Sequence, residues 1–136
     1  MEVEVRQTGR EYDHRDLCFF FGFESPARYY YTHIAKAADS NAHNVFLVSD
    51  APRRNLLVPS SQGVDWGTGD WHTVRVERRG GMIRVWFDDK RHPIFTVPEE
   101  DLGWGRVGFG SFDDSGELRR LRLWAPATLD STATAF

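Results

Sequence analysis

The feature that most constrains the fold of this chain is an alternation of apolar residues with a period of two. In the segment "DLCFFFGFE" (16–24), Leu17, Phe19, Phe21 and Phe23 fall on one face, and Cys18, Phe20 and Gly22 fall on the other. Successive side chains of a β-strand point to opposite faces, whereas a helix repeats every 3.6 residues. The alternation therefore predicts strands, and the apolar residues on both faces of 16–24 predict a strand that is covered on both sides.

Two glycines mark the clearest turn in the sequence. Gly80 and Gly81 separate two alternating runs within "WHTVRVERRGGMIRVWFDD" (71–89). Glycine adopts the positive φ angles that tight hairpin turns require, so this segment is interpreted as a β-hairpin. The segment "HPIFTVP" (92–98) has a proline near each end, which suits an edge strand.

In total the patterns indicate about ten strands and no helix beyond a single turn at 98–103. Many short strands separated by turns are typical of a two-sheet antiparallel β-sandwich of the jelly-roll type. We predict one all-β domain over residues 1–125. Residues 126–136, which are rich in Thr, Ala and Ser, are interpreted as a flexible C-terminal tail or linker.

The composition narrows the partners of such a domain. A chain of 136 residues has the length of one domain, and its net charge of −3 with scattered basic residues does not favour binding to nucleic acid. No apolar run approaches the roughly 18–20 residues of a membrane-spanning helix, so no membrane partner is expected. Cys18 is the sole cysteine, so no internal disulfide forms, and its apolar neighbours predict a buried thiol.

The first residues carry no signal-peptide pattern, because Met1 runs directly into the strand-like "EVEVR". We therefore expect a piece of a larger protein that was cut close to its first strand. Its compartment, cytoplasmic or secreted, is not determined by the sequence.

Three segments resemble a known superfamily. They are "DWHTVRVERRGGMIRVWFDD" (70–89), "GRVGFGSFDDSGELRRLRLW" (105–124) and "YYYTHIAKAADSNAHNVFLV" (29–48). The first two are similar to the last strands of the concanavalin A-like lectin/glucanase superfamily, which includes laminin-G-like modules. The third resembles a bacterial branch that is grouped with 3-keto-disaccharide hydrolases and with domains of unknown function. The resemblance implies a jelly roll, but this fold hosts many functions.

The resemblance also implies one or two strands ahead of residue 2 that pair with the C-terminal strand. Their absence would leave a bare sheet edge. A bare edge presents unpaired backbone groups to other chains, so a homo-oligomer formed through this edge is expected.

One candidate binding site surrounds the polar segment "ADSNAHN" (38–44). Side chains of Asp, Asn, His and Arg together offer donors and acceptors of hydrogen bonds, as sugar hydroxyls do. The alternative is a turn in which Asp and Asn bond their own backbone. The candidate carbohydrate-binding residues here are Tyr31, His33, Asp39, Asn41, His43, Asn44 and Arg53.

A second candidate lies on the hairpin, where one face is polar and carries a single aromatic ring that could stack on a sugar. Its members are Arg75, Glu77, Arg84, Trp86 and Asp88. The alternative is a solvated face with cross-strand ion pairs, which contribute little individually.

Calcium is the one cofactor that the sequence suggests, and it is not required for the predicted function. Asp113 and Asp114 in "FDDSG" (112–116) are candidate ligands for calcium, as are Asp39 and Asn41, because calcium prefers oxygen ligands. A turn with acidic starting residues explains "DDSG" equally well. No other cofactor is expected.

These features favour a non-catalytic, lectin-like module of a bacterial polysaccharide-processing protein. The first alternative is a glycoside hydrolase or lyase of the 3-keto-disaccharide type, and the second is a structural domain that self-assembles. Glycosidases generally need two carboxylates across the scissile bond. The Glu-x-Asp-x-x-Glu motif of related glucanases does not occur in "EVEVR" (2–6), so no catalytic residue is assigned.

Overall fold

The computed structural model describes residues 1–57, 62–99 and 102–128. These residues form ten strands in two antiparallel five-stranded sheets and contain no helix, which confirms the predicted all-β sandwich. The strands are β1 (Glu2–Gln7), β2 (Asp16–Ser25), β3 (Arg28–Ala35), β4 (Asn44–Ser49), β5 (Arg54–Asn55), β6 (His72–Arg79), β7 (Met82–Phe87), β8 (Phe95–Pro98), β9 (Arg106–Gly110) and β10 (Gly116–Arg122).

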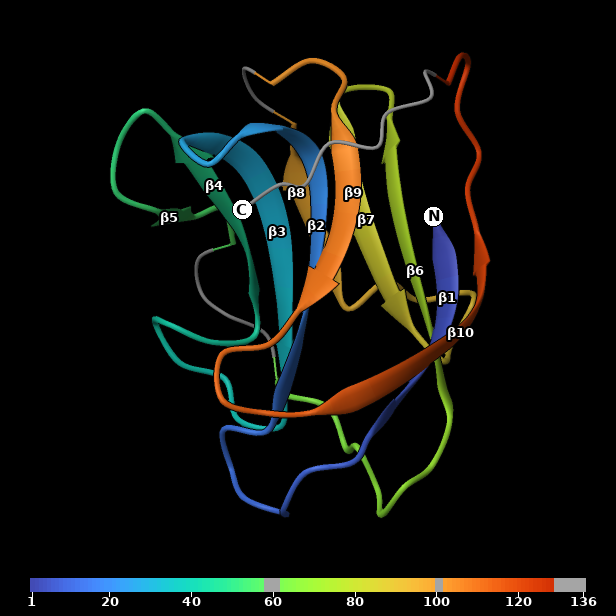
Figure 1. Ribbon diagram of the computed structural model, residues 1–136. Helices are drawn as coiled ribbons and strands as arrows, with labels where there is room; N and C mark the ends of the chain where they lie inside the picture. The colour runs from blue at the N-terminus through green and yellow to red at the C-terminus, as the bar shows by residue number, and fades with distance from the viewer. Residues whose placement is uncertain (58–61, 100–101, 129–136) are drawn as a thin grey trace.

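The two sheets have the strand orders β10-β1-β6-β7-β8 and β5-β4-β3-β2-β9. Figure 1 shows them as two layers, with the chain passing from one layer to the other between β9 and β10. The connections that follow β1, β3 and β9 lie together at the lower end of this view. This end of the sandwich carries the site described below.

The core lies between the layers and is built by the alternation seen in the sequence. The aliphatic inward-facing residues of β1, β6 and β7 meet Phe19 and Phe21 of β2 across the interface. Trp66, from the connection between β5 and β6, is fully buried in the same cluster. Burying an apolar side chain stabilises the fold by roughly 1.5–3 kcal/mol. Because the alternation directs these apolar side chains to the inner face of each sheet, their burial holds the two sheets together.

The hairpin forms at the two glycines. Gly80 and Gly81 have φ angles of 63° and 71°, and Arg79 pairs with Met82 across the turn. A two-residue turn with positive φ at both positions matches the right-handed twist of the strands.

One residue of β2 departs from the predicted alternation. Gly22 has a φ of 56°, and the register of β2 shifts in this region against both of its neighbours. Past this bulge the ring of Phe23 stacks on Tyr29, with 5.4 Å between centroids, whereas Phe21 stays in the core. An extra residue in one strand moves the following side chains to the other face.

The edge strands of the first sheet are β10 and β8. β1 is paired on both sides, by β10 and by β6, so the C-terminal strand β10 lies at the edge. The sandwich is open between β9 and β10, where residues of β2, β9 and β10 border a hollow of about 250 Å³. Several large apolar side chains are exposed near this side: Val107, Leu118, Leu121, Leu123 and Trp124.

Two sequence predictions lie partly outside the described residues. Within the predicted tail, residues 126–128 are described and belong to no strand, and 129–136 are not described. Of the predicted helical turn at 98–103, residues 100–101 are not described.

Candidate functional site

A hollow of about 480 Å³ lies at one end of the sheet β5-β4-β3-β2-β9. Its walls come from the connections after β1, β3, β4 and β9, and its floor comes from β2 and β3. The lining residues are Tyr12, His14, Asp16, His33, Asp39, Asn41, Ala42, Arg53, Phe112 and Asp113. Segments from the first and the last part of the chain thus meet at one place.

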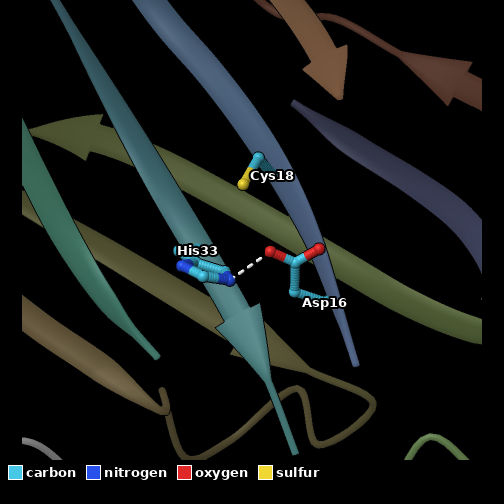
Figure 2. A group of neighbouring side chains, drawn as sticks. All are labelled: Asp16, Cys18 and His33. Atoms are coloured by element: carbon cyan, nitrogen blue, oxygen red, sulfur yellow. Dashed lines mark ion pairs between the residues drawn. The ribbon is translucent and has the colours of Figure 1, made fainter. Parts of the chain in front are cut away.

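The floor of the hollow carries a buried ion pair. Asp16 and Cys18 are two positions apart on β2 and share one face of it, and His33 on β3 lies directly opposite Cys18. Asp16 and His33 form an ion pair, and both side chains are buried, with less than a tenth of their surface exposed. Figure 2 shows Asp16, Cys18 and His33 pointing toward one another from the two strands.

Hydrogen bonds outside the pair fix its orientation. His33 Nδ1 lies 3.2 Å from the carbonyl oxygen of Asn41. A carbonyl oxygen only accepts, so Nδ1 carries the proton, and Nε2 faces the Asp16 carboxylate. The backbone N–H of Asp16 donates to Asp114 Oδ2 over 2.9 Å, which ties the start of β2 to the connection between β9 and β10.

Cys18 completes this buried group. It is 2% exposed, as the sequence predicted. Burial, and secondarily the nearby Asp16 carboxylate, raises the pKa of the Cys18 thiol well above its usual range. In the absence of a cation, the thiol is therefore protonated at neutral pH.

Arg53 forms part of the wall of the hollow. Its guanidinium donates hydrogen bonds to the Tyr31 hydroxyl (2.7 Å) and to Asn41 Oδ1 (3.3 Å). It also lies over the rings of Phe46 and Phe112, at 5.0 and 5.6 Å from their centroids. These contacts fix the Arg53 guanidinium between two aromatic rings at the rim of the hollow, where it can bind a ligand.

The connection 36–43 combines the two alternatives considered for the polar segment: it is a turn bonded to its own backbone, and it borders the hollow. The backbone N–H of Asn41 donates to Asp39 Oδ1 over 2.7 Å. This is the local bond of an Asx turn. Asp39 Oδ2 lies 3.8 Å from His14 Nδ1 across the hollow. The Asp39 side chain is 43% exposed, so a ligand can approach its carboxylate from solvent.

Phe112 presents a well exposed ring to the hollow, at 60%. Its centroid lies 5.3 Å from that of His33 and 6.4 Å from that of Tyr31. Below it a layer of stacked rings, which includes Tyr31 and Phe46 at 4.9 Å, covers the outer face of the sheet. The hollow thus combines one solvent-facing aromatic surface with carboxylate, amide and guanidinium groups.

Three residues predicted for this site do not line the hollow. Tyr31 is buried beneath it and reaches it only through its bond to Arg53, and His43 and Asn44 lie elsewhere. His43 is fully buried, its ring packs edge-on against Phe95 at 4.7 Å, and its Nδ1 accepts the N–H of Ala35 over 3.2 Å. Burial lowers the pKa of His43 to about 4, so its ring is neutral at neutral pH. The Asn44 side chain bonds both backbone groups of Leu57, at 2.8 and 3.1 Å. These two side chains hold the connections in place and do not line the hollow.

The second predicted face forms on the other sheet. Arg75 lies opposite Trp86, and Glu77 lies opposite Arg84, as the hairpin register implied. Arg75 pairs with Glu77 at 3.0 Å, and its guanidinium lies 5.5 Å from the Trp86 ring centroid. Arg84 Nη1 also lies 3.8 Å from Glu77 Oε1 across the two strands, as in the alternative interpretation of cross-strand ion pairs. The face borders neither of the two hollows described here.

Asp88 does not join that face. It follows β7 with a φ of 58° and turns back toward the start of β6. Its carboxylate accepts from His72 Nδ1 at 2.7 Å and from the Thr73 N–H at 2.8 Å. It therefore closes the end of the hairpin.

The predicted calcium ligands diverge. Asp113 lines the 480 Å³ hollow, whereas Asp114 borders the 250 Å³ hollow. Asp114 Oδ2 accepts from the Tyr12 hydroxyl and from the Asp16 N–H, each at 2.9 Å. Over residues 1–57, 62–99 and 102–128, the one group of three side chains with ligand atoms close enough to share an ion is Asp16, Cys18 and His33.

Sequence reasoning missed Asp16 and Phe112. A signal for Asp16 was present, because it precedes Cys18 by two positions and opens a strand otherwise rich in Phe. Phe112 follows β9 outside any alternating run, so no pattern marked it.

Comparison of the chain with protein-family models, curated proteins and solved structures gave no match. The structure also contains, in its described part, no helix that is long and apolar enough to cross a membrane.

Proposed function

We propose that this chain is a non-catalytic carbohydrate-binding module, part of a bacterial polysaccharide-processing protein, and that it binds sugar in the 480 Å³ hollow. The observation that carries the proposal is the exposed Phe112 ring beside the polar groups of Asp39, Asn41 and Arg53. The C–H faces of a sugar ring pack on an aromatic side chain, and its hydroxyls bond to carboxylate, amide and guanidinium groups.

The size and rigidity of the hollow support this proposal. Small-molecule sites commonly have volumes between about 300 and about 1000 Å³. The hollow, at about 480 Å³, falls within that range. Arg53 is held by Tyr31 and Asn41 before any ligand arrives, so binding costs little ordering of this side chain.

The test compares two aromatic substitutions. Phe112→Ala removes the ring in the hollow, and the matched control Trp86→Ala removes a ring on the opposite sheet. A glycan array with the wild-type protein selects a ligand, and isothermal titration calorimetry then measures its affinity for each variant. We expect Phe112→Ala to weaken binding by about 1–3 kcal/mol, the range of a stacking contact, and Trp86→Ala to bind like the wild type.

Two results would contradict the proposal. Loss of binding in Trp86→Ala alone would move the site to the face of β6 and β7. No glycan binding at millimolar concentrations would remove the lectin-like function.

A specific observation favours a hydrolase or lyase as the second candidate. The buried pair of Asp16 and His33 lies on the floor of the same hollow, where one group can accept a proton and the other can position it. In that case Asp16→Asn would abolish sugar turnover while leaving glycan binding intact. A binding module instead shows no turnover in the wild type.

The third candidate is self-assembly through β10. Leu118 and Leu121 are each 45% exposed on this strand, which lies at the edge of its sheet. A second copy that adds a strand to β10 would cover these side chains. Sedimentation velocity at several concentrations tests this candidate, and a monomer at all of them would exclude it.

A further inference from the structure

We propose that Asp16, Cys18 and His33 form a binding site for a divalent transition-metal ion of the zinc class, with one coordination position open to the hollow. This proposal goes beyond carbohydrate binding. It is tested with metal alone, so its outcome is independent of whether a glycan binds.

The first support is the placement of the ligand atoms. One carboxylate oxygen of Asp16, the sulfur of Cys18 and one ring nitrogen of His33 all lie within 4.8 Å of one another. The side chains come from two paired strands, and Figure 2 shows them converging. Metal–ligand bonds of roughly 2.0–2.3 Å around one ion require ligands grouped in this way.

The second support is the electrostatics of the pair. Because the Nδ1 proton of His33 is donated to Asn41, the other ring nitrogen, Nε2, is the atom that faces the Asp16 carboxylate. Two acceptors that face each other in a buried place repel unless a proton or a cation lies between them. In the ion pair a proton lies between them, and a metal ion that replaces this proton converts both groups into ligands.

The third support is that one oxygen of the Asp16 carboxylate lacks a hydrogen-bond partner. Oδ2 pairs with His33, whereas Oδ1, the other oxygen, is buried and has no hydrogen-bond partner within the described residues. Buried polar atoms are rarely left unsatisfied, and unsatisfied ones often mark a place for an ion or a water molecule.

The ligand set selects the metal. Thiolate and imidazole suit zinc and its neighbours in the first transition row, whereas calcium and magnesium prefer oxygen alone. Metal-binding histidines usually donate the N–H of their other ring nitrogen to a carbonyl or carboxylate oxygen, which fixes the orientation of the ring. The contact between His33 Nδ1 and the Asn41 carbonyl is of this kind. Three protein ligands leave a fourth position for water or a ligand. Asp16 and His33 line the hollow, so this position is reached from it.

Binding exchanges two protons for the metal. The Cys18 thiol and His33 Nε2 each lose a proton to solvent, and the sulfur and the nitrogen form bonds to the ion without any change in oxidation state. No further reactant is required.

The test uses Co²⁺ as a spectroscopic probe for Zn²⁺ on the full chain. We expect one equivalent of Co²⁺ to produce a thiolate-to-cobalt charge-transfer band in the near ultraviolet and to be displaced by one equivalent of Zn²⁺. Cys18→Ala should lose the band, and His33→Gln should weaken cobalt binding by at least tenfold. The matched control is His92→Gln, which changes a histidine whose side chain is 82% exposed and should leave the spectrum unchanged.

Circular dichroism establishes that each variant is folded. If Cys18→Ala does not fold, the wild-type spectrum and the His33→Gln affinity still decide the question. The proposal is overturned by stoichiometric cobalt binding without a thiolate band, by no binding at micromolar metal, or by an unchanged affinity in His33→Gln.

Discussion

The neutral, buried His43 makes the stability of the fold depend on pH in a way that one substitution can isolate. His43 is fully buried, has a φ of 55°, and accepts a hydrogen bond from the backbone of Ala35. Protonation would remove this acceptor and bury a charge. We expect His43→Asn to remove most of this pH dependence, because Asn does not titrate and tolerates the left-handed backbone conformation.

The magnitude follows from the two pKa values. The pKa of His43 is lowered to about 4 in the folded protein by burial, and it is about 6.5 in the unfolded chain. The unfolded state therefore binds the proton more readily, and stability is lost as the pH falls from about 6.5 toward about 4. The loss amounts to about 2 kcal/mol at pH 5 and reaches about 3 kcal/mol at pH 4.

Urea denaturation at pH 7.5 and pH 5 measures this effect. The free energy of unfolding of the wild type should fall by about 2 kcal/mol more than that of His43→Asn between the two pH values. The other histidines titrate in both proteins, so their contributions cancel in this comparison. Equal pH dependence in the two proteins would refute the assignment of a buried neutral ring.

Three further outcomes are expected. Gly22 has a φ of 56°, and a Cβ there would lie 2.6 Å from Arg78 Nη1. Gly22→Ala should therefore destabilise the fold by about 1–3 kcal/mol in urea denaturation, and an unchanged midpoint would argue against the bulge. Gly105→Ala should cost at least as much, since its Cβ would lie 2.5 Å from the backbone of Gly22, and a stable variant would contradict the close approach of this residue to β2. Burial and the bond to Asp114 raise the pKa of Tyr12 to about 12. Asp114→Asn should lower this pKa in an ultraviolet titration of phenolate, and an identical titration would count against the bond.

The fold could be predicted from the sequence because its cause is local. Alternation with a period of two is repeated along each strand, and turn residues such as Gly80 and Gly81 separate the strands. The register of the hairpin followed from the same pattern, which placed Arg75, Glu77, Arg84 and Trp86 on one face. The bulge at Gly22 was not predicted, since a glycine inside a strand does not reveal by itself whether it is regular or bulged.

The candidate site was predicted only in part. The predicted residues His33, Asp39, Asn41 and Arg53 do line one hollow. His43 is close to them in sequence, but its backbone is left-handed and its ring packs against Phe95 in the core. One residue of difference along a strand changes the face, so proximity in sequence does not decide which side chains share a site.

The sequence by itself determined the all-β class, the strands and the alternation that builds the core, because these depend on side chains a few positions apart. The tertiary structure alone decided which connections meet: it brought Phe112 to His33 from a distant part of the chain, and it placed Asp16 beside His33 by pairing β2 with β3. A binding site requires groups from separate segments to converge. That convergence depends on how the two layers pack and on which strands are neighbours, and neither is encoded in any single stretch of the chain.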